Sequence, residues 1–190
     1  MLAPVALIVF LCANTYSARL LPKIKAHVIN KAREYAVSVI NTVVEREITS
    51  GYLIYSELVT FVKTENGAVT AIITDTARVS ACETRVTALA EQCLKNAPRK
   101  ALSIPLGEVT NIALFSRLRL PVHRKTVTNV TAQIKSELEP SGAFITRHKL
   151  ALIITAEIIL QVPGGSATAE VTSLIPIAEA VIFGNAPKGG

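Results

Sequence analysis

The longest regular pattern of apolar and polar positions in the chain lies in residues 145–162. From Leu150 to Val162 every even-numbered residue is apolar, whereas the odd-numbered positions include Thr155, Glu157 and Gln161. Successive side chains of a strand point to opposite faces, so this alternation predicts a long strand with one face in a core. We expect it to be the central strand of the fold.

Breaker residues separate this strand from an apolar alternation on each side. They are Pro140-Ser141-Gly142 before it and Pro163-Gly164-Gly165-Ser166 after it. Such clusters mark turns, and they predict an antiparallel meander of three strands over residues 122–138, 144–162 and 167–176.

The register of the meander can be tested from the sequence. Pairing Ile134 with His148 places the even residues of the first strand, Thr128 included, on the face of the central strand that carries its even residues. Pairing Val162 with Ala167 adds the third strand to the same face. Both hairpins therefore predict one buried face.

Residues 20–49 show the three-to-four-residue period of an amphipathic helix. One polar stripe runs through His27, Lys31, Glu34, Ser38, Asn41 and Glu45. We expect the helix to end near Ser50-Gly51, with Gly51 as its C-cap.

A hairpin and a second helix follow. Alternating runs over residues 58–63 and 68–73 flank Asn66-Gly67, which is among the strongest hairpin signals. Thr74 or Asp75 then caps a helix that reaches about Asn96. A further short helix is expected over residues 108–117. The fold class is therefore α+β: an N-terminal membrane anchor and long amphipathic helix, a β-hairpin plus second helix, and a C-terminal three-stranded antiparallel meander.

The start of the chain is apolar from Leu2 to Ala13, and the run approaches the length of a membrane span if it continues through Leu20-Leu21. We expect residues 1–21 to be an anchor of the signal-anchor kind and residues 22–190 to form a single α+β domain. A cleaved signal peptide and a buried helix are the alternatives.

The topology of a single-pass protein would follow from its flanking charge. Arg19, Lys23 and Lys25 follow the apolar run, which by the positive-inside rule places the body in the cytoplasm. A basic segment upstream of the apolar run would reverse that orientation. We expect this reversed orientation, with the globular domain on the outer side.

Composition excludes several classes of function. The formal net charge is +6, but the basic residues are dispersed, Trp is absent and aromatic residues make up 5% of the chain. Nucleic acid is therefore not an expected partner, whereas the lipid bilayer is. Asp75 is the only aspartate, which excludes Asp-paired catalytic designs. Three cysteines, an odd number, argue against a disulfide scaffold.

No motif for a cofactor or a metal is present, and the three histidines do not form a constellation. One cluster near the first turn of the meander remains, formed by His148 with Glu137 and Glu139. A histidine beside a carboxylate is either a tuned base or a satisfied polar pair. We expect no catalytic, cofactor-binding or metal residues, and a functional surface at Glu137, Gly142 and His148.

Several short segments resemble the sporulation protein YunB family. The most specific are Ile104-Pro105-Leu106-Gly107 and Ile175-Pro176-Ile177-Ala178-Glu179. Other matching positions are Tyr52, Leu58, Asn66-Gly67, Thr110, Leu120-Pro121-Val122, Glu137, Gly142, His148, Pro163, Val181-Ile182-Phe183-Gly184 and Pro187. The chain departs from the family at Gly142-Ala143-Phe144-Ile145-Thr146, where only the glycine and the threonine are kept, and it lacks the basic segment that precedes the family's membrane helix.

This resemblance implies a membrane-anchored protein made in the mother cell during endospore formation. The family has no established catalytic residues, so none is transferred. We expect a non-enzymatic assembly or interaction factor whose partners are envelope or sporulation proteins. The alternative is an envelope ligand-binding or hydrolytic domain that uses the region of His148 and Glu137.

Overall fold

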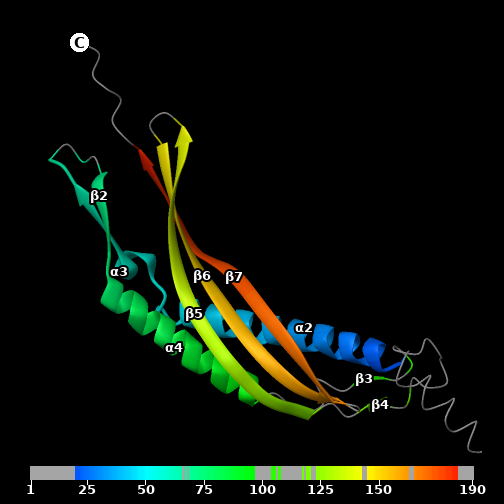
Figure 1. Cartoon of the computed structure of the whole chain (residues 1–190). Coiled ribbons are helices and arrows are strands. Elements are labelled where there is room, and N and C mark those ends of the chain that lie inside the picture. Colours follow the sequence, from blue (N-terminus) through cyan, green and yellow to red (C-terminus); the bar gives the residue numbers. More distant parts are fainter. Residues whose placement is uncertain are drawn as a thin grey trace, which may run out of the picture. The chain divides into compact units, whose positions relative to one another are not determined.

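The computed structural model describes residues 20–65, 67, 69–96, 104–105, 107, 117, 119–120, 123–142, 145–162 and 165–183. Its elements follow the chain in the order α2 (Leu21–Thr49), α3 (Tyr55–Leu58), β1 (Val59–Lys63), β2 (Val69–Thr74), α4 (Thr76–Lys95), β3 (Ile104–Pro105), β4 (Arg119–Leu120), β5 (His123–Gly142), β6 (Ile145–Val162) and β7 (Gly165–Phe183) (Figure 1). The expected α+β class, with a long helix, a hairpin, a second helix and a three-stranded sheet, is confirmed.

Two expected elements lie almost entirely outside the residues that the structure describes. The anchor at residues 1–21 lies outside the described residues except for its last two positions, and so does nearly all of the short helix expected over residues 108–117. Among the helices that the structure describes, none is both long enough and apolar enough to span a bilayer.

Helix α2 begins and ends where its periodicity predicts. Its buried side chains recur every three or four residues along one stripe: Ile24, Val28, Ala32, Ala36, Ile40, Val43, Val44 and Glu47. The helix ends in a Schellman motif, in which the Tyr52 amide donates to the Glu47 carbonyl and the Gly51 amide donates to the Ile48 carbonyl. Gly51 has a φ of 75°, so the predicted glycine C-cap is confirmed.

The hairpin of β1 and β2 is antiparallel, as the Asn66-Gly67 signal predicts, and its register pairs Val59 with Thr74. One turn of helix, α3, precedes it and was not expected. Leu58 was predicted to open the strand, but it closes α3 and is buried. The strand begins only at Val59.

Helix α4 begins after Asp75, whose carboxylate accepts a hydrogen bond from the Arg78 amide at 3.0 Å. An aspartate in this position satisfies one of the amides that the first turn leaves without an intrahelical partner. Asp75 is therefore the N-cap, as expected. The buried side of the helix is formed by Cys82, Val86, Ala90 and Leu94.

The three-stranded sheet has the order β5-β6-β7, as the meander predicts (Figure 1). Every even-numbered residue of β6 from His148 to Val162 is buried. The bounds of its neighbours differ from the expectation. The predicted break at Pro140-Ser141-Gly142 is wrong, because β5 continues to Gly142. Strand β7 likewise runs beyond Pro176 to Phe183.

The predicted face of Thr128 is also wrong. Thr128 is exposed and its neighbour Val127 is buried, whereas Ala132 further along β5 is buried as predicted. The change in the alternation coincides with Asn129, which adopts a φ of 56°. A residue in this left-handed conformation interrupts the pleat, so the side chains on its two sides alternate out of phase.

The contacts of the chain group into two compact units. The first unit comprises Met1–Ser38, Leu94–Asn129 and Ala156–Val171. In it the Arg33 side chain donates a hydrogen bond to the Glu170 carbonyl. Its buried residues are largely small or branched: Ala32 and Ala36 of α2, Ala156, Ile158 and Leu160 of β6, and Ala167, Ala169 and Val171 of β7.

The second unit comprises Val39–Cys93, Val130–Thr155 and Thr172–Gly190. Its core contains buried residues of every described helix and of two strands: Leu150, Leu152 and Ile154 of β6, Ile40 and Val44 of α2, Cys82 and Val86 of α4, Leu58 of α3, Val59 of β1, and Leu53 from the segment between α2 and α3. The residues expected to form a functional surface, Glu137, Gly142 and His148, all belong to this unit.

Candidate functional site

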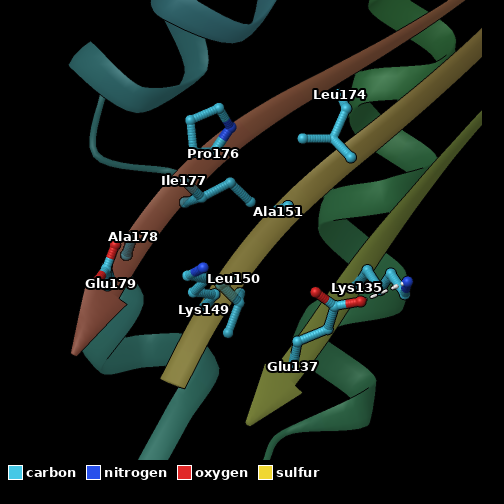
Figure 2. Close-up of a pocket in the computed structure, with 10 residues that line it drawn as sticks. All are labelled: Lys135, Glu137, Lys149, Leu150, Ala151, Leu174, Pro176, Ile177, Ala178 and Glu179. Atoms are coloured by element: carbon cyan, nitrogen blue, oxygen red, sulfur yellow. Dashed lines mark ion pairs between the residues drawn. The ribbon is translucent and has the colours of Figure 1, made fainter. Parts of the chain in front are cut away.

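A shallow groove lies on the sheet of the second unit, over all three strands (Figure 2). We call it the outer groove. It encloses about 460 Å³ and is lined by Lys135, Glu137, Lys149, Leu150, Ala151, Leu174, Pro176, Ile177, Ala178 and Glu179. The members from β5 and β7 flank Ala151 of the central strand in Figure 2. Because Lys149 and Ala151 alternate with the buried Leu150, the groove is centred on the face of β6 that turns away from the core.

The lining of the outer groove is mostly apolar, and its most prominent member is Leu174, which is 65% exposed. Three further large apolar residues at this end of the sheet are exposed: Leu138, Val181 and Phe183. A groove with a mostly apolar lining is typical of an interaction surface. The geometry therefore favours contact with an apolar surface over binding of a strongly polar ligand.

Ion pairs border the groove and leave it without net charge. Lys135 Nζ lies 2.5 Å from Glu137 Oε1, and Lys149 Nζ lies 2.6 Å from Glu139 Oε2. On the other side Arg147 Nε lies 2.8 Å from Glu179 Oε1, a contact without hydrogen-bond geometry that is held by charge. Hydrogen bonding to Lys135 lowers the pKa of Glu137 below its usual value. Each charge at the border is thus already neutralised by a neighbour.

His148 occupies the opposite face of the same sheet end and is completely buried. Its Nδ1 shares a hydrogen bond of 2.6 Å with the Tyr55 hydroxyl, and its Nε2 shares one of 2.7 Å with the Ser136 hydroxyl. A neutral imidazole donates from one nitrogen and accepts at the other, and a hydroxyl serves in either role. Burial lowers the pKa of His148, because desolvation disfavours the charged form.

The three residues expected to form a functional surface are thus separated by the sheet. Glu137 borders the outer groove and His148 faces the core, while Gly142 ends β5. Glu137 bonds Lys135, and the partners of His148 are Tyr55 and Ser136. Sequence reasoning missed both partners, since Tyr55 precedes His148 by 93 residues and a lone serine in a strand carries no signal.

A second buried ionisable residue was also missed. Glu47 near the end of α2 is 2% exposed, and its Oε2 accepts a hydrogen bond of 2.6 Å from Arg85 Nε of α4. The Arg85 guanidinium also lies over the Tyr52 ring, 4.0 Å from the centroid. Hydrogen bonding to Glu47 raises the pKa of Arg85. This arrangement fixes the segment after α2 against α4 and has the form of a structural contact.

Metal ligands do not converge in the part of the chain that the structure describes. No three side chains from among its His, Cys, Asp and Glu residues are placed to hold a metal ion. The cysteines in this part are free, with Cys82 buried in the helix interface.

Comparison with known proteins finds one family model and one curated relative that the chain resembles. Residues 101–189 match the model of the family described as Sporulation protein YunB. Among curated proteins, "Sporulation protein YunB" of Bacillus subtilis (strain 168) is 25% identical over 136 residues, covering 65% of this chain and 54% of the relative. The chain thus spans about half the length of the relative it matches. No solved structure matches the chain significantly. The predicted resemblance to the YunB family is confirmed.

Proposed function

From the match of residues 101–189 to the YunB sporulation proteins, we propose that this chain acts in endospore formation as a non-enzymatic assembly or interaction factor of the mother-cell envelope. The outer groove is the observation that supports an interaction role most directly. An apolar lining with a neutralised border suits a protein partner, because burying it does not require the desolvation of unpaired charges.

Membrane anchoring is part of the same proposal. It is supported by the apolar run from Leu2 to Ala13, which approaches the length of a membrane span if it continues through Leu20-Leu21. In this account the protein crosses the bilayer once and presents its α+β domain on the outer side. Deleting residues 2–18 should move the protein from the membrane fraction to the supernatant of lysed sporulating cells. Retention of the truncated protein in washed membranes would contradict the anchor.

The interaction role is tested by site-specific photo-cross-linking in sporulating cells. A photoreactive phenylalanine analogue replaces Leu174 in the groove, and in the control it replaces Ile73 of β2, which is similarly exposed at 56%. We expect a discrete cross-linked product, identified by mass spectrometry as an envelope protein, from position 174 alone. Equal products from both positions, or none from either, would refute the groove as the contact surface.

A hydrolytic function is the second candidate, and one observation favours it. The Ser136 hydroxyl lies 2.7 Å from Nε2 of His148, which is the distance between a nucleophile and its base. The same contact also satisfies a buried imidazole nitrogen, and the outer groove is not lined by Ser136. Ser136→Ala removes both the nucleophile and the contact with His148, so the stability of the variant must be measured together with its effect on sporulation. Loss of sporulation in a stably folded Ser136→Ala protein would favour hydrolysis, and normal sporulation would exclude it.

A further inference from the structure

The outer edge of β5 carries a backbone amide that is bonded by a helix side chain. Strand β5 lies at the edge of its sheet with β6 as its neighbour. The Ile134 amide donates a hydrogen bond of 2.7 Å to Glu83 Oε1 of α4. The carboxylate of Glu83 thus stands where the carbonyl of an added strand would stand.

The preceding residues of β5 offer the same edge without such a side chain. Main-chain groups of a strand point to the same side every second residue, so those of Ala132 and Val130 point to the side that the Ile134 amide faces. Asn129, with its positive φ, ends this regular stretch. The edge available to a partner is therefore short and covers residues 130–133.

A groove runs along this edge, and we call it the edge groove. It encloses about 500 Å³ and is lined on the strand side by residues 130–133. On the helix side it is lined by Glu83, Thr84, Thr87, Ala88 and Glu91, which recur at helical spacing. Threonine and alanine are small, so an extended backbone can approach β5 without meeting long side chains. A helix beside a free strand edge is the arrangement in which peptides bind by strand addition.

The charge of the edge groove distinguishes between two possible occupants, a second copy of the chain and a basic peptide segment. Its ionisable lining residues are Glu83 and Glu91, and its other lining residues are uncharged. A second copy of the chain, paired edge to edge, would bring two such acidic sets together. A basic segment would instead meet complementary charge.

We propose that the edge groove binds an extended peptide segment carrying Lys or Arg, which adds to β5 as an antiparallel strand opposite Val130 and Ala132. The bound segment hydrogen-bonds the main chain of β5 and places a basic side chain on the acidic helix side of the groove. The site ends at Ile134, because the amide of this residue already donates its hydrogen bond to Glu83. This site lies on other residues than the outer groove, so the proposal does not depend on the role of that groove in sporulation.

The test begins with selection of phage-displayed dodecapeptides on the purified full-length chain in detergent. Counter-selection uses Ala88→Phe, in which a bulky side chain fills the groove from an exposed helix position. The matched control is Ala81→Phe, the same change at another exposed position of α4 outside the groove. Thermal melts establish that the variants are folded. Gln133→Lys, which adds positive charge at the groove, replaces Ala88→Phe if the latter unfolds.

We expect selected peptides to be rich in Lys or Arg and in β-branched residues. A labelled peptide from the selection should bind at least tenfold more weakly to Ala88→Phe and Gln133→Lys than to the wild type, with Ala81→Phe unchanged. It should also slow hydrogen exchange of the Val130 or Ala132 amide. Recovery of no peptide that distinguishes the wild type from Ala88→Phe, equal affinity for all variants, or unchanged exchange in residues 130–134 would each overturn the proposal.

Discussion

The hydroxyl of Tyr55 lies 2.6 Å from Nδ1 of His148, although 93 residues separate them in the chain. Through this contact the single turn of α3 is attached to β6, the middle strand of the three-stranded sheet, near the beginning of that strand. The Tyr55 ring also packs near Phe61 of β1, with 5.9 Å between the ring centroids. The cluster therefore joins the hairpin segment to the C-terminal half that matches the sporulation proteins.

Removal of the Tyr55 hydroxyl should destabilise the fold. Tyr55→Phe keeps the ring but leaves a buried imidazole nitrogen without a partner, which costs about 1–3 kcal/mol. Urea denaturation followed by circular dichroism measures the change in the free energy of unfolding. Thr131→Ala, an exposed change on β5, is the control and should have little effect. Equal stabilities of Tyr55→Phe and the wild type would contradict the proposed importance of this contact.

Acidification should destabilise the protein through His148. Its pKa is lowered below the usual 6.5 by burial, so between the two values the unfolded chain binds a proton that the folded chain does not. The free energy of unfolding is therefore at its full value above pH 6.5. It decreases as the pH falls below 6.5, by at most about 1.4 kcal/mol per pH unit, until the folded pKa is passed.

Denaturation curves between pH 7.5 and 5 measure this slope. The lowered pKa of Glu137 acts in a separate window, because its contribution is lost only below the usual carboxyl value of 4.5. His148→Gln should flatten the profile above pH 5, and NMR titration of the imidazole gives the folded pKa directly. A His148 pKa at or above 6.5 would show that the burial of the ring does not govern its protonation.

Gly51 should resist substitution by residues with a β-carbon. At its φ of 75° an alanine is strained, which costs about 1 kcal/mol, while the space around it is ordinary, with Ile54 Cδ1 3.5 Å from the added carbon. Gly51→Asn should lose less than Gly51→Ala, since asparagine tolerates the left-handed conformation. Thermal melts compare the two, and the opposite ranking would mean that conformational strain is not the cause.

The Glu47–Arg85 pair should show strong coupling. Arg85→Met leaves the buried Glu47 carboxylate without its partner and should lower the midpoint of urea denaturation. Replacing both partners by apolar residues, in the double variant Glu47→Leu with Arg85→Met, should restore part of the lost stability, because no charge then remains buried. A double-mutant cycle on the unfolding free energies measures this, and additive effects would contradict direct coupling.

Local features of the fold could be predicted because each rests on neighbouring residues. The stripe of α2 and its glycine cap, the Asp75 N-cap, the Asn-Gly hairpin and the alternation of β6 are signals of this kind. The end of β5 at Gly142 could not be predicted in this way. Pro140 normally breaks a central strand, but it is tolerated in an edge strand such as β5. Likewise, the only trace of the phase change at Asn129 in the hydrophobic pattern is the three-residue spacing between Val127 and Val130, which does not by itself identify the irregular residue.

The candidate site was predictable only in part. Glu137 and His148 were identified by their nearness to the turn, but which face each occupies depends on the register of β5 and on its irregularity. The outer groove combines residues of three strands, and its ion pairs join positions as distant as Arg147 and Glu179. Such arrangements follow from tertiary packing and cannot be read from local spacing.

The count of heat-resistant spores from cells whose only copy of the gene carries Leu174→Glu tests the interaction account most directly. This change places an unpaired charge in the outer groove without altering the core, and Ile73→Glu is the matched control on an exposed residue of β2. With both proteins present at wild-type levels by immunoblot, the account predicts at least a tenfold loss of spores for Leu174→Glu and none for Ile73→Glu. Wild-type spore counts from both strains would contradict it.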